Sequence, residues 1–122
     1  MLATLDHVRL TAPAGCEPLL RTFYADLLGI QEVTAPPVLA VRSACWFTGE
    51  HGGAHLHLGT ETPFLPGTRT HPGLRVHDID ALADRLDTHH APVVWDDRLP
   101  GHRRFFTLDP VGNRLEFLQP VP

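Results

Sequence analysis

The sequence contains no lysine, and all ten of its basic residues are arginine. This absence excludes a lysine Schiff base, a lysine general base and a phosphate-binding lysine, so any side chain that clamps an anion has to be arginine. The fourteen acidic residues outnumber the basic ones, the net charge is −4, and no basic run appears. The charge balance therefore gives no support for binding to nucleic acid or to an anionic membrane.

Cysteine is also scarce, because Cys16 and Cys45 are the only two and they do not form a CxxC motif. This usage favours reduced thiols and a cytoplasmic location over a secreted disulfide framework. The first residues lack the basic and apolar regions of a signal peptide, and no apolar run is long enough to span a membrane. With 43% hydrophobic residues in 122, the chain is expected to form a single domain over residues 1–122.

An internal repeat organises the chain. When the sequence is shifted by 59 residues, residues 46–50 fall on residues 105–109, and without a gap His57 falls on Glu116. A His-x-x-Leu pattern also occurs near the start of each half. A repeat at a fixed offset indicates two equivalent structural modules. A pseudo-twofold axis between them predicts that four positions converge, namely His7, His57, His71 and Glu116.

The pattern of apolar residues predicts a β-α-β-β-β order in each half. In the first half, strands are expected at 5–11, 30–33, 38–42, 45–48 and 54–58, one more than this order contains, with a helix from Pro18 to a C-terminal Gly29. In the second half, strands are expected at 74–77, 93–95, 103–108 and 114–118, with a helix whose N-cap is Asp80. The modules then cover about residues 1–60 and 70–122, joined by a linker rich in Thr, Pro and Gly. The expected fold class is α+β, with the two modules packed into one curved mixed sheet, a half-barrel, and the helices outside.

The four converging positions supply three imidazoles and one carboxylate. This is a reasonable donor set for Zn²⁺, Ni²⁺, Fe²⁺ or Mn²⁺. If His57 does not bind, two histidines and Glu116 remain, with open positions for a substrate oxygen. The competing interpretation is that most of the nine histidines lie on the surface without a role. It is favoured for His51, His77, His89 and His90.

Several other side chains are candidates for contact with a substrate. A histidine two positions before His57 shares its face of a strand. The two tryptophans are either aromatic walls of a pocket or part of the core. Of two adjacent arginines in a strand, only one can face the cavity, and a bulge would change which one. These candidates are Trp46, His55, Trp95, Arg103 and Arg104, while Cys45 is interpreted as a small buried hydrophobic residue.

Three segments together resemble a known family. They are Asp6-His7-Val8-x-Leu10, Phe23-Tyr24-x-x-Leu27-Leu28-Gly29 and Asp109-Pro110-x-Gly112-Asn113-x-Leu115-Glu116. They are similar to the glyoxalase, bleomycin-resistance and extradiol-dioxygenase group, the vicinal oxygen chelate superfamily, over nearly the whole chain. The resemblance implies paired βαβββ modules and commonly a homodimer.

The resemblance also implies roles for particular positions. The first-strand ligand falls on His7, the ligand at the start of the second module on His71, and the last-strand ligand on Glu116. His57 stands where glyoxalase I has a second glutamate, so this chain offers one carboxylate to the proton shuttle and not two. The lysine found around the phosphonate in fosfomycin-resistance transferases is missing, and extradiol dioxygenases usually carry two such two-module domains.

Three functions follow as hypotheses. The leading one is a divalent-metal-dependent lyase or isomerase that acts on a small substrate with vicinal oxygens, with Glu116 or His57 transferring the proton. The alternatives are a metal-free dimer that binds a small molecule or an antibiotic, as bleomycin-binding members do, and a single-domain dioxygenase. The least specific interpretation is a structural domain whose site has decayed.

Overall fold

The computed structural model describes all residues from 1 to 122. The chain divides into two compact units, unit 1 (Met1–Pro66) and unit 2 (Gly67–Pro122). The boundary falls inside the segment rich in Thr, Pro and Gly that was predicted to link the modules. None of the helices combines the length and the apolar character needed to cross a membrane.

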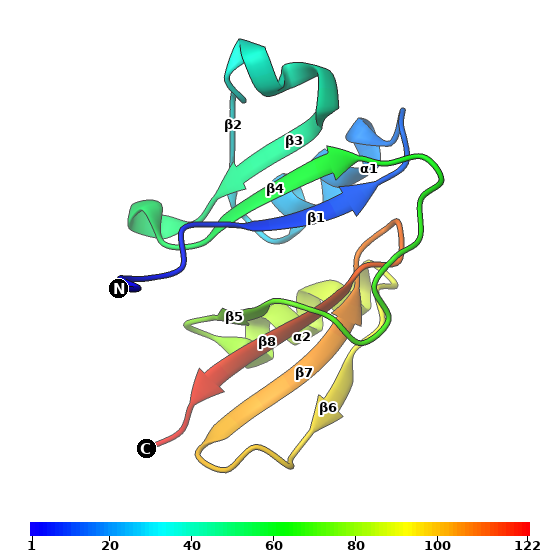
Figure 1. Ribbon diagram of the computed structural model, residues 1–122. Helices are drawn as coiled ribbons and strands as arrows, with labels where there is room; N and C mark the ends of the chain where they lie inside the picture. The colour runs from blue at the N-terminus through cyan, green and yellow to red at the C-terminus, as the bar shows by residue number, and fades with distance from the viewer. The chain divides into compact units, whose positions relative to one another are not determined.

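Unit 1 is a four-stranded mixed sheet with one helix packed on it. Its strands follow the order β1-β4-β3-β2, in which β1 is parallel to β4 and the other neighbours are antiparallel (Figure 1). Two 3₁₀ turns lie in the connections that flank β3. The elements are β1 (Val8–Ala12), α1 (Glu17–Leu20), η1 (Arg21–Leu27), β2 (Gln31–Val33), η2 (Pro37–Arg42), β3 (Ser43–Thr48), η3 (Glu50–Gly52) and β4 (His55–Thr60).

The helix of unit 1 forms where its apolar stripe predicts it. Pro18 occupies the first turn, where a missing N–H costs nothing, and Gly29 follows the end of the helix at a φ of 75°. The second part, η1, is a π-helical segment in which the Leu28 N–H donates to the Phe23 carbonyl. The buried side chains that the helix and sheet share are Leu20, Phe23, Tyr24, Leu27, Cys45, Phe47, Leu56 and Leu58.

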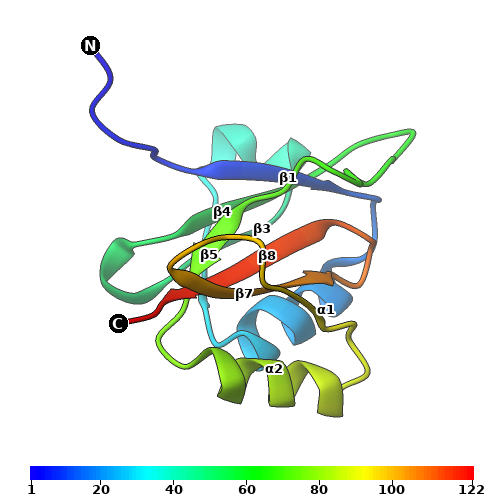
Figure 2. The same ribbon diagram turned by 90° about the horizontal axis from the view of Figure 1, so that it is seen from below.

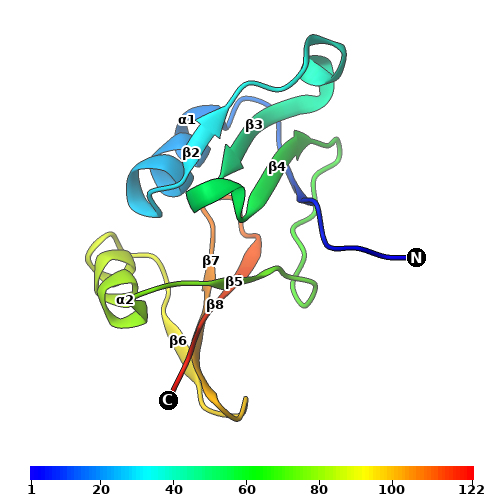
Figure 3. The same ribbon diagram turned by 90° about the vertical axis from the view of Figure 1, so that its left-hand side faces the viewer.

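Unit 2 repeats this arrangement with the strand order β5-β8-β7-β6. Here β5 is parallel to β8, and the β8–β7 and β7–β6 pairs are antiparallel. The helix α2 packs against one face of the sheet, as Figure 2 and Figure 3 show from two directions. The elements are β5 (Gly73–Arg75), α2 (Ile79–Thr88), β6 (Val94–Asp96), β7 (His102–Leu108) and β8 (Arg114–Pro120). The core consists of Ile79, Ala83, Leu86, Phe105, Leu115 and Phe117.

The predicted fold class is confirmed. Each unit is a βαβββ module with a mixed sheet, and neither sheet alone would have both faces covered, which is why a helix lies on one of them. Closure of the two modules into one curved sheet stays a prediction.

Sheet registers show that the two units are equivalent, but they correct one detail of the repeat. His57 pairs across the sheet with Trp46, and Glu116 pairs with Phe106. Trp46 is therefore equivalent to Phe106, whereas the ungapped repeat had matched it with Phe105. The reason is that the β3–β4 connection is one residue longer than the β7–β8 connection. A loop absorbs such an insertion because no ladder of hydrogen bonds runs through it.

Residues 38–42 form the 3₁₀ turn η2, so the strand predicted there is wrong. Pro36 and Pro37 begin this turn, and the Leu39 N–H donates to the Pro36 carbonyl at 2.9 Å. The apolar side chains that suggested a strand are not buried, since Val38 is 85% exposed and Val41 is 90% exposed. Proline fixes φ and supplies no N–H to a sheet, which favours a turn over a central strand.

The first strand begins at Val8 and not at the predicted Leu5. Leu5 is 76% exposed and has no strand beside it, so its apolar character does not place it in the sheet. His7 is therefore the residue directly before β1, and His71 likewise lies shortly before β5.

The N-cap of α2 is Asp78 and not the predicted Asp80. The Asp78 carboxylate accepts a hydrogen bond from the Ala81 N–H at 3.0 Å, while Asp80 pairs with Arg103. We expect Asp78→Ala to lower the free energy of unfolding by about 1 kcal/mol, because a helix N–H loses its acceptor. Asp80→Ala, which removes an exposed ion pair, is expected to lower it less. Urea denaturation of both variants measures the difference, and the reverse order would contradict the assignment.

Candidate functional site

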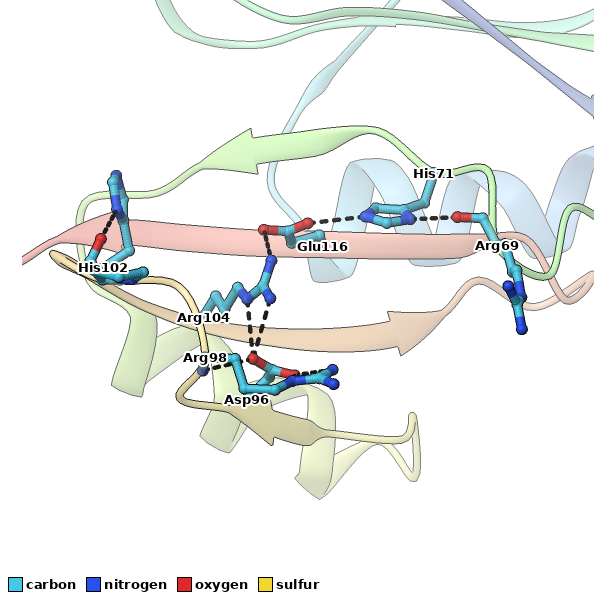
Figure 4. Close-up of polar contacts among 8 residues, drawn as sticks. Arg69, His71, Asp96, Arg98, His102, Arg104 and Glu116 are labelled. Carbon is cyan, nitrogen blue, oxygen red and sulfur yellow. Dashed lines mark hydrogen bonds and ion pairs between the residues drawn. The ribbon is translucent and has the colours of Figure 1, made fainter.

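In unit 2 the structure brings His71 and Glu116 together. Glu116 lies on β8, and His71 lies two residues before β5, the parallel neighbour of β8. The Glu116 N–H donates to the Pro72 carbonyl at 3.1 Å, which holds the residue after His71 against β8. His71 Nε2 then lies 2.8 Å from Glu116 Oε1 (Figure 4). The side chains are 23% and 9% exposed, so the pair is largely shielded from solvent.

The other ring nitrogen of His71 determines which tautomer is present. Nδ1 lies 2.6 Å from the Arg69 carbonyl oxygen, which can only accept, so Nδ1 carries the hydrogen and donates it. In the neutral ring the Nε2 electron pair therefore faces Glu116. Two electron-pair donors directed at one place need a proton or a cation between them. A backbone bond at Nδ1 with a free Nε2 is how metal-binding histidines are commonly held.

The second carboxylate oxygen of Glu116 is bound by Arg104. Arg104 Nη1 donates to Glu116 Oε2 at 3.2 Å, and its Nε and Nη2 donate to Asp96 Oδ1 at 3.3 and 3.1 Å. Asp96 in turn accepts from the side chain and the backbone N–H of Arg98 (Figure 4). The hydrogen bonds from Arg98, followed by those from Arg104, hold the pKa of Asp96 far below its usual range. Asp96 is therefore ionised under all ordinary conditions.

A tight turn positions Glu116 on β8. Asp109 is buried, and its Oδ1 accepts from the Val111 and Asn113 N–H groups at 3.0 and 2.8 Å. Its Oδ2 accepts from the Asn113 side chain at 2.9 Å, and Gly112 adopts a φ of 96° that favours glycine. This turn starts β8 in a defined register, so Glu116 points to the same face as Arg104.

In unit 1 three rings stack on one another. The Trp46 and His57 rings are nearly parallel, with centroids 3.6 Å apart and planes at 2°. The His7 ring lies 4.2 Å from His57 at 20°, and Asp6 lies 2.8 Å from His7 Nδ1. His57 is thus flanked by both rings and fixed in orientation. Burial, His7 and His55 lower the pKa of His57 below its ordinary value, so the ring is neutral at neutral pH.

His55 shares the face of β4 with His57, as strand alternation predicts. Its cross-strand partner is Thr48, while Trp46 is the partner of His57. This face of the sheet is opposite the one that Leu56 and Leu58 bury against the helix.

The two adjacent arginines of β7 point to opposite faces. The β7–β8 ladder runs without a bulge, so Arg104 shares a face with Glu116 and Arg103 does not. Arg103 pairs through both Nη atoms with Asp80 on α2 at 2.6 and 2.9 Å, and it lies 4.9 Å over the Trp95 ring. Trp95 and Arg103 therefore belong to the face that α2 covers. A shallow hollow of about 370 Å³ at the β6–β7 edge is lined by Trp95, Asp96, Asp97, His102, Arg103 and Arg104.

The thiol of Cys45 is not suited to nucleophilic chemistry. The residue is buried, and burial raises the pKa of its thiol to about 11. Because the thiolate is the reactive form, Cys45 is unreactive at neutral pH. This agrees with its interpretation as a small hydrophobic residue.

The sequence did not predict the hydrogen bonds that Asp96 and Arg98 form. Asp96 is the last residue of β6, and Arg98 lies in the loop that follows it. The Asp-x-Arg spacing allows the carboxylate to cap the Arg98 N–H, which was the available signal. Nothing in the spacing indicated that the same carboxylate would also bind Arg104 on the neighbouring strand.

Each unit contributes two of the four predicted ligand positions. Unit 1 holds His7 and His57, and unit 2 holds His71 and Glu116. No group of three or more His, Cys, Asp or Glu side chains is arranged as a metal site within either unit.

Comparison with known families identifies the chain. The family model for the Glyoxalase/Bleomycin resistance protein/Dioxygenase superfamily matches residues 18–117. The chain belongs to this superfamily. The resemblance seen in its sequence motifs is thereby confirmed. No curated protein matches the chain.

Solved structures of several proteins share the fold. A glyoxalase family protein from Bacillus anthracis is 36% identical over 99% of this chain and 98% of its own, with a TM-score of 0.93. A lactoylglutathione lyase from Agrobacterium tumefaciens is 17% identical over 98% and 95%, with a TM-score of 0.74. TnmS3, an antibiotic binding protein from Streptomyces sp. CB03234, is 22% identical over 99% and 100%, with a TM-score of 0.72. The sequence identity to these last two proteins is low, so the similarity to them shows only that the fold is shared.

Proposed function

We propose that this glyoxalase-superfamily protein is a divalent-metal-dependent lyase or isomerase, active as a homodimer on a small substrate with vicinal oxygens. The metal ligands in this proposal are His7, His57, His71 and Glu116. Their identities suit Zn²⁺, Ni²⁺, Fe²⁺ or Mn²⁺, since imidazole and carboxylate bind all of these ions.

The observation that carries the proposal is the arrangement of His71 and Glu116. In the neutral ring, His71 Nε2 presents an electron pair, because Nδ1 donates its hydrogen to the Arg69 carbonyl. Glu116 Oε1 lies 2.8 Å from that nitrogen, and the other carboxylate oxygen is bound by Arg104. Two donor atoms are thus oriented in advance, each by a separate hydrogen bond behind it, which is typical of residues that bind metal.

The side chains of unit 1 support the same interpretation. A histidine must be neutral to donate to a metal, and the pKa of His57 is lowered. Stacking between Trp46 and His7 limits rotation of the His57 ring. These two features prepare His57 either to bind or to accept a proton.

Proton transfer is assigned to His57 and Glu116. Either group, as a neutral imidazole or as a carboxylate, can take a proton from a carbon next to a carbonyl group, and the same group, then protonated, can return it to the neighbouring atom. When bound, a divalent ion would polarise a substrate oxygen and stabilise the charge that develops there by several kcal/mol. No lysine is available for these roles, and the Cys45 thiol is excluded by its raised pKa.

Metal analysis of untagged protein tests this function. About one ion per chain, present on purification or after reconstitution with Zn²⁺, Ni²⁺, Mn²⁺ or Fe²⁺, supports it. The preferred ion also separates the subclasses, because Fe²⁺ or Mn²⁺ would favour a dioxygenase and Zn²⁺ or Ni²⁺ a lyase or isomerase. No ion under any of these conditions would contradict the proposal. His7→Ala extends the test, since it should reduce bound metal if His7 is a ligand.

A metal-free binding protein is the second candidate, favoured by the stacked rings of unit 1. Trp46, His57 and His7 form an aromatic group on one face of the sheet, which suits a planar ligand. TnmS3 from Streptomyces, a protein of the same fold, is an antibiotic binding protein, which supports a binding function for this chain. In a Trp95→Phe background, Trp46 is the only tryptophan, so its fluorescence reports ligand binding directly. Tight binding that is unchanged by chelators and by His71→Ala, which leaves the stacked rings of unit 1 in place, would favour this candidate.

A further inference from the structure

A chain of alternating charges lies behind Glu116. It runs from Glu116 to Arg104, then to Asp96 and Arg98, with donor–acceptor distances between 2.6 and 3.3 Å (Figure 4). The inner members are poorly exposed, with 18% of the Arg104 side chain and 9% of the Asp96 side chain accessible. Hydrogen bonds between ionised groups are stronger and more directional when solvent is largely excluded.

We propose that Arg104 is a positioning residue for Glu116, and that Asp96 and Arg98 hold Arg104 in place. The inference rests on the proposed function, in which Glu116 is a metal ligand. Arg104 occupies Oε2, so the carboxylate offers Oε1 alone on the side of His71. Without Arg104, rotation about the carboxylate would let either oxygen, or both, face the metal.

The contacts of Arg104 separate this role from that of a substrate clamp. Its Nε and Nη2 donate to Asp96 and its Nη1 donates to Glu116, so all three nitrogens already bind carboxylates. The guanidinium also lies 5.2 Å over the Phe106 ring. An anionic substrate would have to displace one of two carboxylates, which makes Arg104 unsuited to bind it.

The two units use different means to hold their equivalent residues. His57 in unit 1 is held by the rings of Trp46 and His7. The first residues of β3, where Arg104 would have its counterpart, are Ser43, Ala44 and Cys45, none of them charged. An imidazole is oriented by stacking, whereas a carboxylate needs a hydrogen-bond donor. The arginine therefore occurs in the unit whose ligand is a carboxylate.

The neighbouring arginine supplies a matched control for the experiment. Arg103→Met and Arg104→Met each remove one guanidinium that pairs with an aspartate, but only Arg104 touches Glu116. Zn²⁺ affinity is measured by competition with a chromophoric chelator. We expect Arg104→Met to bind Zn²⁺ about 10- to 100-fold more weakly, as is usual when a residue that is hydrogen-bonded to a metal ligand is lost. Arg103→Met should bind Zn²⁺ like the wild type. Arg104→Lys should restore part of the loss, because one charged donor returns.

A second variant tests whether Asp96 acts through Arg104. Asp96→Asn should weaken Zn²⁺ binding in the wild-type background but add nothing to Arg104→Met. The absorption spectrum of Co²⁺-loaded protein should change in Arg104→Met, because the carboxylate can bind in a new mode. A purely structural role would leave that spectrum unchanged. Thermal unfolding of the metal-free variants identifies any that do not fold. If Arg104→Met does not fold, the Zn²⁺ affinities of Asp96→Asn and Arg104→Lys test the proposal in its place.

The outcomes separate this inference from the proposed function. A folded Arg104→Met variant could show the Zn²⁺ affinity and the Co²⁺ spectrum of the wild type while Glu116→Ala loses its Zn²⁺ affinity. That result would overturn only the positioning role of Arg104. Unchanged affinity in Glu116→Ala and His71→Ala, or no metal binding in the wild type, would overturn the proposed function and this inference with it.

Discussion

His71→Ala is expected to abolish high-affinity metal binding, with a loss of more than about 100-fold. The substitution removes the Nε2 electron pair and leaves Glu116 without its neighbour 2.8 Å away. The expected loss exceeds that for Arg104→Met because a ligand is deleted and not only its support. Elemental analysis after equilibration with one equivalent of Zn²⁺, together with chelator competition, measures the effect.

His77→Ala is the control for this substitution. His77 is an exposed histidine near the other end of β5, so its replacement makes the same chemical change away from Glu116. It should retain metal and, once a substrate is known, turnover. If both variants bound metal equally well, His71 could not be a ligand. The arrangement of His71 and Glu116 would then be a structural ion pair.

Phe105→Ala is expected to lower the free energy of unfolding by about 3–5 kcal/mol. The Phe105 ring is fully buried, lies 5.3 Å from the Trp95 ring and 5.5 Å from the Phe117 ring, and packs on the face that α2 covers. Its removal leaves a cavity that the surrounding strands cannot fill. Since domains are typically stable by only about 5–15 kcal/mol, this is a large fraction of the total.

Urea denaturation measures this loss as a lower midpoint with an unchanged slope. Val94→Ala is the control, because Val94 lies on the adjacent strand β6 but is 60% exposed. Its effect should stay within about 0.5 kcal/mol. A loss below about 1 kcal/mol for Phe105→Ala would mean that the core of unit 2 does not depend on this ring.

Much of the architecture followed from local sequence patterns. The apolar pattern that ends at Gly29 predicted the helix of unit 1, and the strands predicted at 103–108 and 114–118 left the turn between β7 and β8 to the residues between them. These features depend on neighbouring residues, whose spacing is visible in the sequence. The repeat likewise predicted that His57 and Glu116 occupy equivalent strands, which the sheet registers confirm.

The errors arose where a local pattern had two solutions. Residues 38–42 are apolar enough for a strand, but no partner strand covers them and prolines begin a turn. Asp80 was the predicted N-cap, but Asp78, which lies two residues earlier and has an extended backbone, caps the helix. An ungapped repeat could not show that one hairpin connection is a residue longer than the other.

The βαβββ order of both modules, the superfamily and the candidate ligand types could be predicted from the sequence, because periodicity, turn residues and motifs are local properties of the chain. The structure was needed to show which arginine meets Glu116, which carboxylate holds that arginine, and which nitrogen of His71 donates to the Arg69 carbonyl. Each of these depends on strand register and on contacts between residues far apart in sequence. Alternation along β7 predicted that Arg103 and Arg104 face opposite ways, but only pairing with β8 shows which of them faces the site.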